Sequence, residues 1–228
     1  MTVHRTEVPG TGVREAVRPP ALSAAARATI DTPALIVDLD RVDAAIARMG
    51  EAMSERGVAL RPHAKTHKSV EIGRRQVAAG AVGLTVGTVG EAEVFADGGL
   101  DDLFIAYPMV PAGPKARRLR DLVQRARLRV GIDSVVGAHA VADALADDRE
   151  RVSVLIEIDC GAHRTGVAPN DAGPVAAAAT HLGLDVIGVF THGGHGYHGP
   201  EARAAAADDE VHGLTEAAAS LRAAGIEA

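Results

Sequence analysis

The sequence has little cysteine, few aromatic residues and no long apolar run. Its single cysteine, Cys160, cannot form a disulfide within the chain. No stretch reaches the roughly 18 consecutive apolar residues that a membrane span needs. Because only 2% of the residues are aromatic, the net charge is −6 and there is no basic tract, the features of a nucleic-acid binder are missing. We expect a cytoplasmic globular protein that binds neither membranes nor nucleic acid.

The overall composition favours a single folded domain. Of the 228 residues, 47% are hydrophobic and 24% are charged, which is enough for one α/β or barrel-type domain with its own core. Residues 1–30 mix charges with prolines and lack the continuous apolar core of a secretory signal. We expect residues 1–30 to form a mobile arm and residues 31–228 to form the domain.

Lysine is scarce although positive charge is not. Of the 24 basic residues only Lys65, Lys68 and Lys115 are lysine, and two of them lie close together. An amine can lose its proton and attack a carbonyl group, whereas a guanidinium cannot. Codon usage can also favour arginine over lysine. The scarcity of lysine therefore only directs attention to the stretch around Lys65.

From residue 34 onward, short β-branched runs alternate with longer alanine-rich segments of helical period. Such βα repeats predict a parallel sheet, either rolled into a barrel or left open and doubly wound. In both folds the chemistry gathers at the carboxyl ends of the strands. Seven strands are predicted, at 34–40, 58–65, 82–88, 102–108, 128–133, 152–159 and 185–191.

Polar residues follow these strands at the expected edge. At or just past a predicted strand end lie Lys65, Thr88, Tyr107, Asp133, Asp159, Thr191 and His192. Since the carboxyl ends of parallel strands meet at one edge of the sheet, we expect a site to form there.

Basic and titratable residues alternate in the segment R-P-H-A-K-T-H-K. If this segment is extended, the side chains of Arg61, His63, Lys65 and His67 point to one face. A barrel strand normally presents branched apolar residues inward, so such a face needs solvent or an anionic ligand. An exposed edge strand is the alternative, which Pro62 permits, whereas the flanking βα units favour a central position.

Two loops add further candidates. In I-D-C-G-A-H-R-T-G-V, Asp159 ends a strand and two glycines hold Arg164 in a tight turn, although an ordinary surface arginine is the alternative. In T-H-G-G-H-G-Y-H-G-P (191–200), glycines match G-x-G-x-x-G, but the acidic residue of a dinucleotide site is missing. The three histidines of this loop fix no metal geometry. We expect its bare amides, followed by a helix opening at Pro200, to bind a phosphate.

Together these motifs resemble a known family, the pyridoxal-phosphate enzymes of the D-threonine aldolase and D-serine dehydratase group, which are relatives of alanine racemase. The resemblance covers residues 31 to about 228 in the same order. It rests on D-T-P-A-L-I-V-D-L-D at 31–40, R-P-H-A-K-T-H-K at 61–68, G-E-A-E at 90–93, D-x-G-x-x-R-x-G at 159–166 and T-H-G-G-H-G-Y at 191–197.

The resemblance implies roles for individual residues. Lys65 matches the lysine that forms the Schiff base with pyridoxal 5'-phosphate, and Arg164 matches the arginine that faces the pyridine nitrogen. An arginine there keeps that nitrogen unprotonated, so transamination is disfavoured. His63 shares the predicted face of Lys65 and is a candidate proton carrier. The family has cofactor-binding and phosphate-binding loop residues at the positions of Thr191, Gly193 and Gly194.

The resemblance also implies a (β/α)8 TIM-type barrel of the alanine racemase N-terminal kind. After the leading strand only six barrel strands are predicted where eight are required, so we expect a barrel that is incomplete at its C-terminal end. Family members continue into a β-domain, which in aldolases and dehydratases holds a divalent metal such as zinc or manganese. We expect no metal ligands within this chain and expect the full-length protein to be a homodimer.

The function implied is a lyase that uses pyridoxal phosphate to cleave or dehydrate a D-configured β-hydroxy amino acid. The residues named above serve retro-aldol cleavage and elimination equally well. Amino-acid racemisation, with Lys65 on one face of the substrate, is a second possibility. A pyridoxal-phosphate carrier without turnover and a nicotinamide enzyme built on the glycine loop are the alternatives from other classes.

Overall fold

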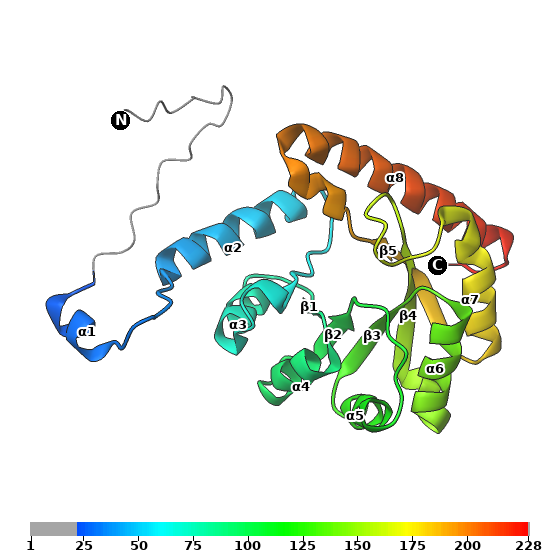
Figure 1. Ribbon diagram of the computed structural model, residues 1–228, viewed down its shortest axis with the longest axis horizontal. Coiled ribbons are helices and arrows are strands. Elements are labelled where there is room, and N and C mark those ends of the chain that lie inside the picture. Colours follow the sequence, from blue (N-terminus) through cyan, green and yellow to red (C-terminus); the bar gives the residue numbers. More distant parts are fainter. Residues whose placement is uncertain (1–21, 228) are drawn as a thin grey trace, which may run out of the picture. The chain divides into compact units, whose positions relative to one another are not determined.

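The computed structural model describes residues 22–227 and divides the chain into two compact units, one up to Ala44 and one from Ala45 onward (Figure 1). Most of the expected arm at 1–30 lies outside the described residues. Its described part contains helix α1 (Ala24–Thr29), which Ser23 caps by accepting a hydrogen bond from the amide of Ala26. Helix α2 (Leu39–Ser54) begins in the first unit and continues into the second. Over the described residues, no helix combines the length and apolarity needed to cross a membrane.

The second unit is an α/β fold built on a parallel sheet, as the sequence predicts. Its strands, in the order in which they pair, are β1 (Leu84–Val86), β2 (Asp102–Ile105), β3 (Arg127–Ile132), β4 (Val152–Ile158) and β5 (Asp185–Thr191). The helices are α3 (Val70–Ala78), α4 (Val89–Asp97), α5 (Pro114–Leu122), α6 (Val135–Leu145), α7 (Ala172–His181) and α8 (Pro200–Ala223). Short 3-10 turns are η1 (Ala64–Thr66), η2 (Ala146–Arg151), η3 (Pro169–Asp171) and η4 (Gly194–His198).

Each strand sends alternate side chains to two different environments. In β3, Leu128, Val130 and Ile132 are buried in the main core, which is shared with the helices that follow one another around the sheet (Figure 1). The intervening Arg129 and Gly131 face the other side of the sheet, as period-two alternation requires. The first set holds the helices on the sheet, and the second set is free to carry polar groups.

Two of the seven predicted strands are not strands. The segment 34–40 contains no strand, and the side chain of Leu35 is 91% exposed. The segment 58–65 lies along β1, where the amide of Val82 donates to Leu60 and the amide of Thr85 to Pro62, but it forms only one isolated bridge. Within the described part of the second unit, this segment pairs on one side only, with β1.

The expectation that four side chains of R-P-H-A-K-T-H-K share one face is also wrong. Arg61 lies near the amino ends of the strands, where its Nη1 is 2.7 Å from Oδ1 of Asp102. His67 packs edge-on against Phe95. The reason is that the extended backbone ends at His63, whose side chain caps η1, so the period of two is lost after that residue.

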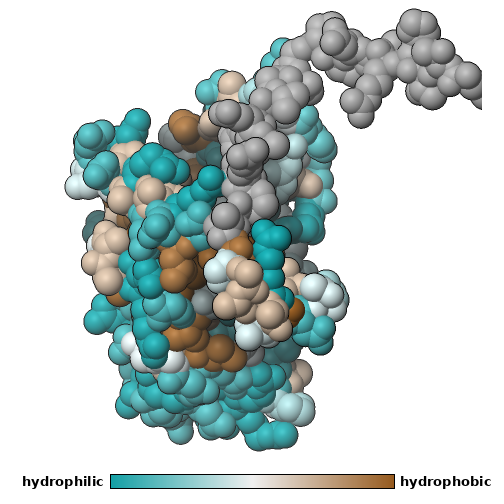
Figure 2. Space-filling model, turned by 90° about the vertical axis from the view of Figure 1, so that its left-hand side faces the viewer, coloured by the Kyte–Doolittle hydropathy of each residue, from teal (hydrophilic) through white to brown (hydrophobic). Residues whose placement is uncertain are grey.

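Large apolar side chains are also exposed on the second unit. A groove of about 310 Å³ is lined by Ile46, Met49, Leu60, Pro62 and Ala79, among others. Figure 2 shows apolar side chains gathered in the middle of one face of the molecule, with hydrophilic side chains around them.

Candidate active site

A cavity of about 440 Å³ lies at the carboxyl ends of the strands, where the sequence predicts a site. Its walls come from the second set of strand positions, those that alternate with core residues, and from the loops that follow the strands. The lining residues are His63, Lys65, Thr85, Gly87, Phe104, Ala106, Tyr107, Glu157, Arg164, Phe190, Thr191 and His192. A volume of this size fits a small organic ligand or cofactor.

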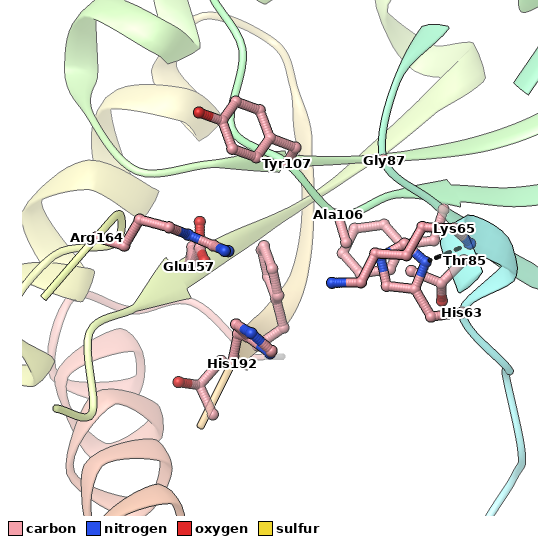
Figure 3. A pocket seen from close by; sticks show the side chains of 12 residues that line it. His63, Lys65, Thr85, Gly87, Ala106, Tyr107, Glu157, Arg164 and His192 are labelled. Atoms are coloured by element: carbon pink, nitrogen blue, oxygen red, sulfur yellow. Dashed lines mark hydrogen bonds between the residues drawn. The ribbon is translucent and has the colours of Figure 1, made fainter. Parts of the chain in front are cut away.

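Two cations face each other across this cavity. The amine of Lys65, from η1, and the guanidinium of Arg164, from the loop after β4, point toward one another (Figure 3). No carboxylate within residues 22–227 forms an ion pair with either of them, whereas neighbouring Lys68 is bound to Glu91 at 2.5 Å. Two unpaired positive charges on opposite walls favour a ligand that carries negative charge.

The ring of His63 is held in one orientation by the backbone. Its Nδ1 accepts a hydrogen bond from the amide of Lys65 at 3.3 Å (Figure 3), and the ring also hydrogen-bonds to the backbone of Thr85. Burial, helped by the charge of Lys65, lowers the pKa of His63 to about 4. His63 is therefore neutral at pH 7 and fixes the turn that carries Lys65.

This neutral ring predicts a loss of stability in acid. The unfolded chain takes up the His63 proton near pH 6.5, while the folded chain resists it until about pH 4, so acid favours unfolding across this window. We expect His63→Asn, whose side-chain oxygen can replace the Nδ1 acceptor, to lose less stability between pH 6.5 and 4. The difference should reach at most about 3 kcal/mol in urea melts of the cofactor-free chain. Equal losses in the two proteins would contradict the assignment.

His192 lies between the two cations, on the strand β5 side of the cavity (Figure 3). Burial first, and then the charges of Lys65 and Arg164, lower the pKa of its imidazole. The sequence marks His192 only as a strand-end polar residue and as one of three loop histidines whose spacing fixes no metal geometry. A neutral imidazole beside the amine of Lys65 is a second group that could carry a proton.

The loop that carries Arg164 is fixed at both ends. Oδ1 of Asp159 accepts the amides of Gly161 and His163, and the amide of Val167 returns to Glu157 O of β4 at 2.9 Å. Gly166 has a φ of +99°, and a Cβ there would lie 2.6 Å from the amide nitrogen of Asp159. Only glycine fits this position without strain. Arg164 is thus held on a defined turn, as the sequence predicts.

Aromatic rings close the bottom of the cavity. Phe104 of β2 and Phe190 of β5 meet edge to face, with ring centroids 5.0 Å apart. Gly131 of β3 makes room for Phe190, because a Cβ at that position would lie 2.7 Å from its ring. Thr191 lines the same cavity, and its hydroxyl donates to the carbonyl of Ile158 at 2.7 Å.

The two glycines predicted to bind phosphate lie outside the lining of this cavity. The amide of Gly193 donates to Oε1 of Glu210 at 2.7 Å, and the amide of Gly194 donates to His192 O at 2.8 Å. The Gly193 amide therefore already donates its hydrogen bond to a carboxylate oxygen, that of Glu210. Gly194 lines an adjacent cavity of about 340 Å³, which shares Arg164 and His192 with the first. Helix α8 opens at Pro200, as expected.

One charged group of this site was not singled out in the sequence: Glu157, which is buried within an apolar strand. Tyr107, one of the strand-end polar residues, projects from the loop after β2 and lines the cavity. The alternation of side chains along β4 could have identified Glu157. It places Glu157 on the same face as Asp159, while Ile156 and Ile158 lie on the other face. In the part of the chain that the structure describes, no three histidine, cysteine or acidic side chains are placed to hold a metal ion together.

Comparison with known proteins places this geometry in a family. The model of the alanine racemase N-terminal domain matches residues 37–228. The chain belongs to this family. The D-threo-3-hydroxyaspartate dehydratase of Delftia sp. strain HT23 is 43% identical over 204 residues, which is 87% of this chain and 53% of that protein. The D-threonine aldolase of Arthrobacter sp. is 36% identical over 185 residues, which is 81% of this chain and 48% of that protein.

The solved structure of the Delftia dehydratase superposes with a TM-score of 0.80 at 41% identity, over 87% of this chain and 54% of that one. The resemblance seen in the motifs is thereby confirmed, as is the fold class. The chain spans about half the length of the curated relatives it matches.

Proposed function

We propose that this chain binds pyridoxal 5'-phosphate through Lys65 and supplies the cofactor domain of a lyase that acts on D-configured β-hydroxy amino acids. The observation that carries the proposal is the pair of unpaired cations, Lys65 and Arg164, that face each other across a cavity of about 440 Å³. Two relatives that are more than a third identical in sequence are a dehydratase and an aldolase of such substrates.

The residues present fit this cofactor. Lys65 offers a primary amine to the aldehyde, the Phe104 and Phe190 rings offer an apolar floor to the pyridine ring, and Arg164 offers donors at the opposite wall. The phosphate is assigned to the loop that contains Thr191, Gly193 and Gly194, where a carboxylate already accepts the Gly193 amide. When bound, pyridoxal phosphate supplies the ring that draws electrons away from the substrate's Cα.

The other side chains position groups and move protons. His63 keeps the turn of Lys65 in place, and it can serve as the expected proton carrier once a ring nitrogen leaves its backbone partner. His192 is already neutral and lies beside the Lys65 amine, so we propose it as a second proton carrier. A divalent metal that helps ionise the substrate hydroxyl would need ligands outside residues 22–227. We propose that a homodimer likewise completes its site with residues outside this range.

Product analysis tests this function. The chain, supplied with pyridoxal phosphate and Mn²⁺ or Zn²⁺, is incubated with D-threonine, D-serine and D-threo-3-hydroxyaspartate. Retro-aldol cleavage of D-threonine gives glycine and acetaldehyde, while dehydration gives ammonia with pyruvate from serine or oxaloacetate from 3-hydroxyaspartate. Either set supports the proposal and separates aldolase from dehydratase. Racemisation of any of these substrates with no cleavage product and no ammonia would contradict it.

Arg164 is predicted to tune reactivity more than affinity. If its guanidinium faces the ring nitrogen and loop amides hold the phosphate, Arg164→Glu should leave the cofactor bound but raise side transamination. Arg164→Lys, which keeps the charge, is the matched control and should transaminate less. The measurement is the yield of keto acid and pyridoxamine phosphate in single turnovers. Loss of cofactor binding with an unchanged melting curve would show that Arg164 grips the phosphate instead.

A further inference from the structure

The turn that carries Lys65 is held on both sides. On its N-terminal side, His63 caps the turn and forms a bridge to Thr85 of β1. On its C-terminal side, the amine of Lys68 lies 2.5 Å from Oε1 of Glu91, which belongs to the first turn of α4. Lys65 therefore sits between two contacts, and the second is made by two residues that do not line the cavity.

Glu91 also binds the neighbouring wall of the cavity. Its Oε2 accepts the amide of Gly87 at 2.8 Å, and Gly87 lines the cavity directly after β1. Burial acts to raise the pKa of Glu91, but the hydrogen bonds from Lys68 and Gly87 outweigh it and lower the pKa. The carboxylate is therefore charged at pH 7, and its two oxygens join the segment after Lys65 to the loop after β1.

The backbone of Lys68 indicates that its side chain is needed. Its φ is +51°, a left-handed conformation that glycine adopts without strain and that costs energy for a lysine. Lys68 connects the Lys65 turn to Ser69, which caps α3. A glycine would make this connection at lower cost but could not reach Glu91. The contact with Glu91 thus gives a reason for a strained lysine at this position.

We propose that Glu91 and Lys68 form a positioning clasp for Lys65, in which their ion pair keeps the turn against the β1 wall of the cavity. The inference rests on the proposed function, because the step that the clasp helps is the condensation of the deprotonated Lys65 amine with the cofactor aldehyde, which forms a C=N bond and releases water. The side chain of Lys68 is 64% exposed and that of Glu91 14% exposed. Because exposed ion pairs are weak, we expect an effect of up to about fivefold.

Substitutions at Lys68 test the clasp, and the measurement is the rate of covalent capture of pyridoxal phosphate. Lys68→Met keeps an apolar stem but loses the charge, so capture should slow by up to about fivefold while its final extent stays complete. Lys68→Arg keeps the ion pair and cannot itself condense with an aldehyde, so its rate should match that of the wild type. A wild-type rate in Lys68→Met, or an equally slow rate in Lys68→Arg, would contradict the clasp.

Lys68→Gly separates positioning from stability. It removes the backbone strain together with the ion pair, so its free energy of unfolding in urea should equal or exceed that of Lys68→Met. Capture should nevertheless be at least as slow as in Lys68→Met, because the contact with Glu91 is missing in both. If the rates follow the free energies of unfolding instead, the pair serves stability alone and the proposal fails.

Two glutamates of α4 provide a matched comparison. Glu91→Gln keeps an oxygen that can accept the Gly87 amide but loses the charge that pairs with Lys68, so capture should slow as in Lys68→Met. Glu93→Gln breaks an ion pair with Arg118 of α5, away from the clasp, and should leave the rate unchanged. Equal rates for the two variants would overturn the assignment of Glu91.

Hydrogen exchange of the cofactor-free chain examines the turn without any chemistry. The amide of Lys68 donates to the carbonyl of Ala64 at 2.8 Å. Exchange over residues 64–68 should be faster in Lys68→Met than in the wild type and in Lys68→Arg, whereas equal protection in all three would contradict the clasp. If the wild type takes up no pyridoxal phosphate, the proposed function fails, while this exchange still decides whether the clasp holds the turn.

Discussion

Lys65→Ala is expected to abolish covalent retention of pyridoxal phosphate and to reduce turnover by roughly 10²–10⁴-fold, the range seen when a positioned proton-transfer group is removed. The amine of Lys65 points into the cavity, and no carboxylate in the described residues neutralises it. Removing it takes away both the nucleophile for the aldehyde and one of the two cations that favour an anionic ligand. The measurement is the absorbance of protein that has been mixed with cofactor and then desalted.

Two further variants separate charge from chemistry. Lys65→Arg keeps the positive charge but cannot add to an aldehyde, so we expect weak, reversible binding without covalent retention. Lys68→Ala should retain the cofactor fully, because the Lys68 amine is bound to Glu91 outside the cavity lining. Retention by Lys65→Ala together with loss in Lys68→Ala would contradict the assignment of Lys65.

Gly166→Ala is expected to destabilise the fold by roughly 3 kcal/mol or more and to displace Arg164. The positive φ of +99° costs energy for any side chain, and the new Cβ would also lie 2.6 Å from the amide nitrogen of Asp159 and 2.8 Å from the carbonyl carbon of Ile158. These are backbone atoms of β4 and the residue that follows it, and they cannot turn aside. Because the same turn carries Arg164, we also expect weaker binding of pyridoxal phosphate.

Gly80→Ala is the matched control for this substitution. Gly80 has the same φ of +99°, but a Cβ added there would meet no atom within 4 Å. Its loss of stability measures the backbone strain alone, and urea melts of the two variants give the steric part by difference. Equal free energies of unfolding for the two variants would show that the Arg164 turn is not tightly packed.

The sequence predicts the α/β class well because period-two alternation and helical period follow from local geometry. The five strands that form are runs whose apolar residues also find a neighbouring strand to pair with. The run at 34–40 has the same apolar character, but no such partner supports it in the described residues. A strand needs a neighbour to satisfy its amides and carbonyls, and a single window of sequence does not show whether that neighbour exists.

Site residues that follow a strand end can be predicted from the sequence, whereas roles that depend on contacts across the sheet cannot. The sequence brings Lys65, His63 and Arg164 to one edge, and the structure places all three around one cavity. It does not show that His63 caps a turn, because that contact depends on the backbone conformation after residue 63. It does not mark Glu157 either, since an isolated acidic residue in a strand is usually exposed, and only tertiary packing buries this one.

The central claim is that the cavity between Lys65 and Arg164 is a pyridoxal-phosphate site with Lys65 as the covalent anchor. It is tested most directly by mixing the wild-type chain with the cofactor, reducing with borohydride, and mapping the labelled peptide by mass spectrometry. The account predicts a single phosphopyridoxyl group on Lys65. A label on Lys68 or Lys115, or no label on a correctly folded chain, would contradict it.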